Sequence, residues 1–199
     1  MDQKIRLTAK EPLHEGYLQV YKYNLEIPSF SPSKKLISLE GREVVHSNDS
    51  ILVLIYAPLI DSFILCKEFR AGVFCNTNRD DPFILECVSG TIDKNSNPEE
   101  TAYREVHEES GLVVEHVQHI ASVYKSPGLM TEKTHIYYAE FFGTPEEGLH
   151  GLKDENEELL TQVLLREKVY MLMDTMKIID AATLIALYWF RAKYHNKKN

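Results

Sequence analysis

Residues Gly90 to Leu112 read GTIDKNSNPEETAYREVHEESGL and contain the most informative pattern in the chain. Pro98 begins a run of good helix formers, and proline is favoured at the first position of a helix. Glu99 and Glu100 follow it, where the positive end of the helix dipole stabilises acidic side chains. Gly111 is typical of the position just past a helix. The segment therefore predicts a helix that starts at Pro98 and ends before Gly111.

Three carboxylates lie close together on the predicted helix. Glu105 and Glu109 are four residues apart and Glu108 is three residues from Glu105, so a helix places them on adjacent surface. Like charges at this spacing cost about 0.2–0.5 kcal/mol per pair, and Arg104 alone cannot neutralise three of them. A hard cation such as Mg²⁺ can, because it is usually held by carboxylates together with substrate phosphates. For an E-x-x-E-E pattern taken alone, a solvated acidic helix face is the alternative interpretation.

The whole segment follows the pattern G-x5-E-x7-R-E-U-x-E-E-x-G-U, in which U is a bulky apolar residue, and it resembles the Nudix box. The match is carried by Gly90, Arg104, Glu105, Val106, Glu108, Glu109, Gly111 and Leu112. One position departs from the pattern, because its first Glu is Ser96 in this chain. In the family that Glu belongs mainly to the turn before the helix, so Ser96 concerns the loop geometry more than the chemistry.

The resemblance implies an α+β fold, an α/β/α sandwich in which a mixed β-sheet lies between helices, with an added N-terminal β-hairpin region. Apolar and β-branched runs predict strands over residues 17–27, 50–56, 62–69, 83–88, 117–124, 135–142 and 160–165. Helices are expected near residues 166–175 and 180–195, and an acidic loop over 146–158. We therefore expect a β-rich segment over residues 1–49 and a Nudix domain over residues 50–199.

Beyond the box, the chain resembles the ADP-ribose pyrophosphatase branch of the family over nearly its whole length. Three stretches carry this: Ser126-Pro127-Gly128 followed by Thr131-Glu132, the run GLHGLKDENEEL over 148–159, and the tail IIDAATLIALYWF over 178–190. The resemblance implies Mg²⁺-dependent hydrolysis of ADP-ribose to AMP and ribose 5-phosphate, with Mn²⁺ as a substitute metal. It also implies a homodimer that exchanges its N-terminal segments. Two alternatives remain open: a pyrophosphatase of GDP-mannose or another nucleotide sugar, and a non-catalytic Nudix domain that senses a nucleotide.

The resemblance also assigns roles to individual residues. The general base is Glu155, the metal ligands are Ser89 through its carbonyl, Glu105, Glu109 and Glu157, and the substrate-binding residues are Tyr17, Arg42, Arg70 and Glu132. Gly90, Arg104, Glu108 and Gly111 keep structural roles in the box. These residue types suit the chemistry, because a diphosphate needs cations to spread its charge and guanidinium groups bind phosphate oxygens bidentately. Without the resemblance, each assignment has an alternative. Tyr17 would be a residue that packs in a strand, and each of the two arginines would be an ordinary surface residue. Residues 154–157 would form a solvated acidic loop.

Composition narrows the range of partners. The chain has 199 residues, 44% of them hydrophobic, and a formal charge of −8, which fits one globular domain with a small extra lobe and does not favour nucleic acid. The apolar runs are too short to cross a membrane, and the first residues lack the apolar centre of a signal peptide. Cys66, Cys75 and Cys87 have no metal-site spacing, and we expect them to be core-filling thiols in a reducing cytoplasm.

Overall fold

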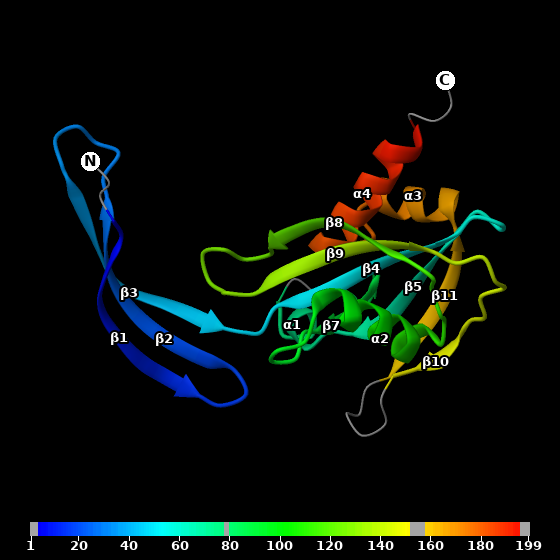
Figure 1. Ribbon diagram of the computed structural model, residues 1–199, viewed down its shortest axis with the longest axis horizontal. Helices are drawn as coiled ribbons and strands as arrows, with labels where there is room; N and C mark the ends of the chain where they lie inside the picture. The colour runs from blue at the N-terminus through cyan, green and yellow to red at the C-terminus, as the bar shows by residue number, and fades with distance from the viewer. Residues whose placement is uncertain (1–3, 78–79, 152–157, 196–199) are drawn as a thin grey trace. The chain divides into compact units, whose positions relative to one another are not determined.

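The computed structural model describes residues 4–77, 80–151 and 158–195 (Figure 1). The chain divides into two compact units. Unit 1 consists of Met1–Asn48 and Tyr124–Lys133, and unit 2 consists of Asp49–Val123 and Thr134–Asn199. Unit 1 therefore takes in the connection between two strands of the central sheet as well as the N-terminal part of the chain.

Unit 1 contains a three-stranded antiparallel sheet in the order β1 (Arg6–Glu15), β2 (Gln19–Pro28) and β3 (Leu36–His46). The described residues of this unit form no helix, and β1 is exposed along its whole length. The Val45 N–H donates to the Leu129 carbonyl at 2.8 Å, and the Thr131 N–H donates to the Val45 carbonyl at 3.0 Å. These two bonds attach the 124–133 segment to β3.

Unit 2 is built on an eight-stranded mixed sheet. Its main order is β10 (Gly148–His150), β11 (Leu159–Leu165), β5 (Ser62–Phe69), β4 (Ser50–Ala57), β9 (Lys133–Glu140) and β8 (Val117–Tyr124). In addition, β6 (Phe83–Glu86) pairs with β5, and β7 (Val88–Thr91) pairs with β4. The β4–β9 pair is parallel, whereas β4 is antiparallel to β5 and β7. The expected mixed sheet is confirmed.

Helices cover both faces of this sheet. On one face, α2 (Pro98–Ser110) buries Ala102 and Val106 against Ile51, Val53 and Ile55 of β4. On the other face lie α3 (Arg166–Asp174) and α4 (Ala181–His195), as Figure 1 shows. Their buried side chains pack against Leu52, Leu54 and Tyr56, the alternate residues of β4. Because both faces of β4 are covered, nearly all its residues are apolar and buried, as expected for a central strand. The α/β/α sandwich is confirmed.

The structure differs from the sequence-based prediction in several elements. The single strand expected over 83–88 is two strands, because the Cys87 N–H donates to the Thr183 hydroxyl of α4 at 3.0 Å instead of joining the sheet ladder. The short elements α1 (Ala71–Phe74) and β10 were not predicted. Cys75 is exposed, so the prediction that all three thiols fill the core is wrong for it, although Cys66 and Cys87 are buried. Among the described residues, no helix is long and apolar enough to span a membrane.

Candidate functional site

Helix α2 carries the predicted carboxylates, and its two ends are fixed as the sequence predicts. At the N-terminus, the Asn97 side chain accepts a hydrogen bond from the Glu99 N–H at 2.8 Å, and Pro98 occupies the first helical position. At the C-terminus, Gly111 adopts the left-handed conformation with φ 67°, and its N–H donates to the His107 carbonyl. A glycine is favoured there because other residues are strained at this φ. These caps set the register that places Glu105 and Glu109 toward the sheet.

Glu105 lies directly over Gly90 of β7. A Cβ atom added at Gly90 would overlap the Glu105 carboxylate, so this close approach requires a glycine. Arg104 pairs with Glu105 at 2.8 Å and with Glu108 at 2.7 Å. Burial alone would lower the pKa of Arg104, but the neighbouring carboxylates outweigh it and raise that pKa, which keeps the guanidinium charged. Arg104 therefore balances two of the three crowded carboxylates.

Glu109 is buried, and its carboxylate contacts the strand next to Gly90. Its Oε2 accepts a hydrogen bond from the Ser89 N–H at 3.1 Å. In a β-strand the N–H and C=O of one residue point to the same edge, so the Ser89 carbonyl faces this side of β7 as well. The structure thus brings Ser89, Glu105 and Glu109 together at one point, where β7 passes under α2.

Arg70 adjoins this point from the position between β5 and α1, where it is the N-terminal cap residue of α1. Its Nε donates to Glu86 at 2.7 Å, one terminal nitrogen donates to Glu68 at 2.7 Å, and the other lies 3.4 Å from the Ser89 hydroxyl. Burial would lower the pKa of Arg70, but Glu86, Glu68 and Glu109 together raise it. The guanidinium is therefore a fixed positive charge beside Ser89 and Glu109.

Glu68 and Glu86 were missed by sequence reasoning. In the β5–β6 pair Cys66 faces Glu86 and Glu68 faces Ile84, which puts both carboxylates on the face of the sheet that α2 covers. The available signal was the presence of Glu68 in the apolar strand run SFILCKEF and of Glu86 in the run FILECV, because a charge that is buried in a sheet requires a partner.

The remaining predicted residues belong to unit 1 or lie outside the described residues. Tyr17, Arg42 and Glu132 belong to unit 1, whereas the residues above belong to unit 2. Tyr17 lies in the turn between β1 and β2 with its side chain fully exposed, so it does not pack in a strand of its own chain. Arg42 lies opposite Tyr23 in the β2–β3 pair, and Glu132 forms an ion pair with Lys125 at 3.0 Å. Glu155 and Glu157 lie outside the described residues.

The donor set at β7 and α2 fits a hard divalent cation. Two carboxylates one helical turn apart and a strand carbonyl are all-oxygen ligands, which Mg²⁺ and Mn²⁺ prefer. Arg104 orients the Glu105 carboxylate and the Ser89 N–H orients the Glu109 carboxylate. Metal ligands are commonly oriented in this way by hydrogen-bond partners that do not touch the metal. Within the described ranges no group of three His, Cys, Asp or Glu side chains is placed to hold a metal, and the predicted ligand Glu157 is not in those ranges.

Comparisons with known proteins agree with this geometry. Residues 49–184 match the model of the NUDIX domain. The chain is 30% identical over 193 residues to the ADP-ribose pyrophosphatase of Haemophilus influenzae, which covers 96% of this chain and 88% of that protein. It is 30% identical to the ADP-ribose pyrophosphatase of Escherichia coli K12, with 98% and 91% covered. It is 29% identical to the GDP-mannose pyrophosphatase of Pectobacterium atrosepticum, with 94% of each chain covered.

A solved structure shares the fold. The crystal structure of an ADP compounds hydrolase superposes with a TM-score of 0.73 and covers 98% of this chain and 97% of its own. The sequence identity is 21%, so this likeness concerns the fold alone.

Proposed function

The chain belongs to the Nudix family, and from that membership we propose that it hydrolyses the diphosphate of ADP-ribose to AMP and ribose 5-phosphate. The observation that carries the proposal is the identity of about 30% to ADP-ribose pyrophosphatases along nearly the whole chain. It is supported by the meeting of Glu105, Glu109 and Ser89 under α2, because a chain that had become a sensor would be expected to lose these ligands first.

A divalent cation, Mg²⁺ with Mn²⁺ as a substitute, would be held by Glu105, Glu109 and the Ser89 carbonyl. When bound, such an ion neutralises the charge of the diphosphate and helps to deliver a hydroxide at neutral pH. Arg104 keeps the two carboxylates of its ion pairs in place, and the Ser89 N–H fixes the Glu109 carboxylate. Arg70 supplies a permanent positive charge for the phosphate oxygens.

Glu155 is proposed as the general base and Glu157 as a further metal ligand, on the resemblance of residues 154–157 to the family pattern. Glu155 takes a proton from a water molecule, whose oxygen attacks one phosphorus of the diphosphate. The bond from that phosphorus to the bridging oxygen breaks, and the bridging oxygen leaves on the other phosphate. Both assignments concern residues outside the described ranges.

Unit 1 is proposed to complete the site of a second copy in a homodimer. Its described residues form no helix, and it exposes Leu7 and Leu13 of β1 together with Tyr17 and Leu18 of the turn that follows. These apolar side chains are available for burial against a partner. In the dimer, Tyr17 would stack on the base, while Arg42 and Glu132 would contact the phosphates and the ribose. The cytoplasm is the proposed compartment, because all three cysteines are free thiols.

GDP-mannose is the second candidate substrate, favoured by the GDP-mannose pyrophosphatase of Pectobacterium atrosepticum at 29% identity. The stacking face of Tyr17 suits adenine and guanine equally. The remaining chemistry is shared, since both substrates contain a diphosphate between a nucleoside and a sugar.

The test is to incubate the purified protein with Mg²⁺ and, separately, ADP-ribose, GDP-mannose, UDP-glucose, NADH and diadenosine polyphosphates, and to separate the products by chromatography. AMP and ribose 5-phosphate from ADP-ribose, at a higher kcat/KM than for any other substrate, are the expected result. Preferential release of GMP from GDP-mannose would show that the proposed substrate is wrong and that the proposed type of reaction, hydrolysis of a diphosphate, is right. No turnover of any diphosphate would contradict the proposal.

A further inference from the structure

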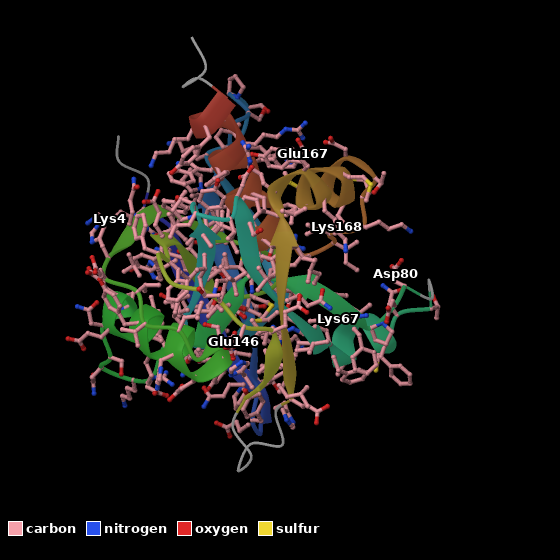
Figure 2. All side chains as sticks on the ribbon, turned by 90° about the vertical axis from the view of Figure 1, so that its right-hand side faces the viewer. Lys4, Lys67, Asp80, Glu146, Glu167 and Lys168 are labelled. Carbon is pink, nitrogen blue, oxygen red and sulfur yellow. The ribbon has the colours of Figure 1, made fainter. Side chains whose placement is uncertain are left out.

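A cross-strand pair beneath the C-terminal turn of α2 holds the backbone of Glu109. Thr161 of β11 lies directly opposite Cys66 of β5, and both side chains are almost fully buried. The Thr161 hydroxyl donates to the Glu109 carbonyl at 2.9 Å, and the Cys66 thiol lies 3.9 Å from the same oxygen. In Figure 2, β11 is the yellow to orange strand that faces the viewer; it runs beside β5, and α3 follows at one of its ends.

This carbonyl has particular need of an outside donor. Glu109 is the residue before the last of α2, and the last four carbonyls of a helix are not satisfied by the helical ladder. A buried hydroxyl donor constrains the position of its acceptor strongly, because water cannot replace the hydrogen bond if the hydroxyl is removed. The Thr161 bond therefore fixes the height of the C-terminal turn above β11 and β5.

The same residue carries the carboxylate that meets Ser89. Glu109 is thus held at two points: its carbonyl by Thr161 and its Oε2 by the Ser89 N–H at 3.1 Å. A shift of the C-terminal turn would move the carboxylate away from β7, since the side chain is anchored to that turn. The hydrogen bond from Thr161 to the Glu109 carbonyl therefore controls the position of the Glu109 carboxylate beside Ser89.

We propose that Thr161, assisted by Cys66, is a positioning residue that sets the place of the Glu109 carboxylate in the metal site. The metal part of this inference rests on the proposed function, whereas the positioning of Glu109 against Ser89 does not. Thr161 acts through Glu109 and touches neither metal nor substrate. A purely structural role would predict a change in stability alone.

The experiment compares three variants of the full-length protein. Thr161→Val keeps the shape and removes the hydroxyl, Thr161→Ser keeps the hydroxyl and removes a methyl group, and Cys66→Val removes the weaker donor. The first measurement is hydrogen exchange of the Ser89 amide by NMR without metal, and the second is Mn²⁺ binding to the substrate-free protein by electron paramagnetic resonance. Thermal unfolding is followed in parallel.

In Thr161→Val we expect faster exchange at Ser89 and a Kd for Mn²⁺ raised about tenfold, the usual effect of losing a group that orients a metal ligand. Thr161→Ser should stay close to wild type in both, even if its Tm falls. Unchanged Ser89 exchange in Thr161→Val, or equal effects in the Val and Ser variants, would overturn the proposal.

The two measurements separate this inference from the proposed function. If the wild-type protein bound no Mn²⁺, the metal-dependent reaction would be contradicted, while Ser89 exchange would still decide the positioning role. If Thr161→Val did not fold, Cys66→Val should show a smaller increase in Ser89 exchange, and no increase there would overturn the inference.

Discussion

At Gly90, the absence of a side chain leaves room for the Glu105 carboxylate. Because a Cβ at Gly90 would overlap only the end of a flexible side chain, Gly90→Ala should displace the Glu105 carboxylate with little change in the backbone. We expect Gly90→Ala to weaken Mg²⁺ activation about 10–100-fold, as for other disturbed metal ligands, with a small change in Tm. Gly72→Ala is the control, because nothing lies within 4 Å of a Cβ there. Equal Mg²⁺ dependence in both variants would contradict this role for Gly90.

A substitution at Glu109 distinguishes an enzyme from a nucleotide sensor. In Glu109→Gln the amide oxygen still accepts from the Ser89 N–H, but the negative charge toward the metal is lost. We expect kcat to fall by about two orders of magnitude or more, while stability without metal is kept because the repulsion from Glu105 is relieved. Glu100→Gln, on the exposed first turn of the same helix, is the matched control. Unchanged turnover in Glu109→Gln would remove the metal site from the mechanism.

The three thiols differ in exposure, and their reactivity should follow. Burial raises the pKa of Cys66 and Cys87, whereas Cys75 is exposed at the end of α1. One thiol should therefore react with a thiol reagent in the native protein at pH 8, and three in denaturant. Because the folded pKa values of Cys66 and Cys87 are raised, their contribution to stability is present below about pH 8.5 and is lost as the pH rises further. Rapid modification of two or three native thiols would contradict the burial.

At the scale of elements, the N-terminal cap of α2 is separable from the chemistry. Asn97→Ala removes the acceptor of the Glu99 N–H, and we expect a loss of about 1 kcal/mol in the free energy of unfolding, measured by denaturant titration. The cap lies at the opposite end of the helix from Glu109, so kcat should be unchanged. Asn97→Ser is the control, since serine also caps helices and should restore the stability. A loss of kcat without a loss of stability would contradict this separation.

The elements that could be predicted from sequence are those with strong local signals. Helix α2 and strands β4, β5 and β8 lie where capping residues and apolar runs predict them. The break at Cys87 could not be foreseen, because it depends on a hydrogen bond to Thr183, 96 residues away in the chain. The ion pair between Arg70 and Glu86 could not be predicted for the same reason, since the pairing of β5 with β6 and not the local sequence brings the two residues together. Strand β1 was missed because it is exposed along its length and contains Pro12, so no alternation of buried residues marks it.

At the scale of the whole molecule, the predicted site residues divide between the two units. Glu105 and Glu109 lie in unit 2, and Tyr17 and Arg42 lie in unit 1. This division is informative, because an inactivating change in one unit can be combined with an inactivating change in the other. The two changes then report whether a working site draws on one chain or on two.

Intersubunit complementation tests the proposed exchange. Glu109→Gln and Arg42→Ala should each be nearly inactive as homodimers. In a heterodimer of the two, isolated by two different affinity tags, exchange would join the intact unit 1 of the first chain to the intact unit 2 of the second. One of the two sites would then be whole, so we expect about half of the wild-type activity per dimer, the result of exchanging equivalent segments between protomers. A heterodimer as inactive as its parents would mean that each site is built within one chain, and a monomer in light scattering would exclude the exchange directly.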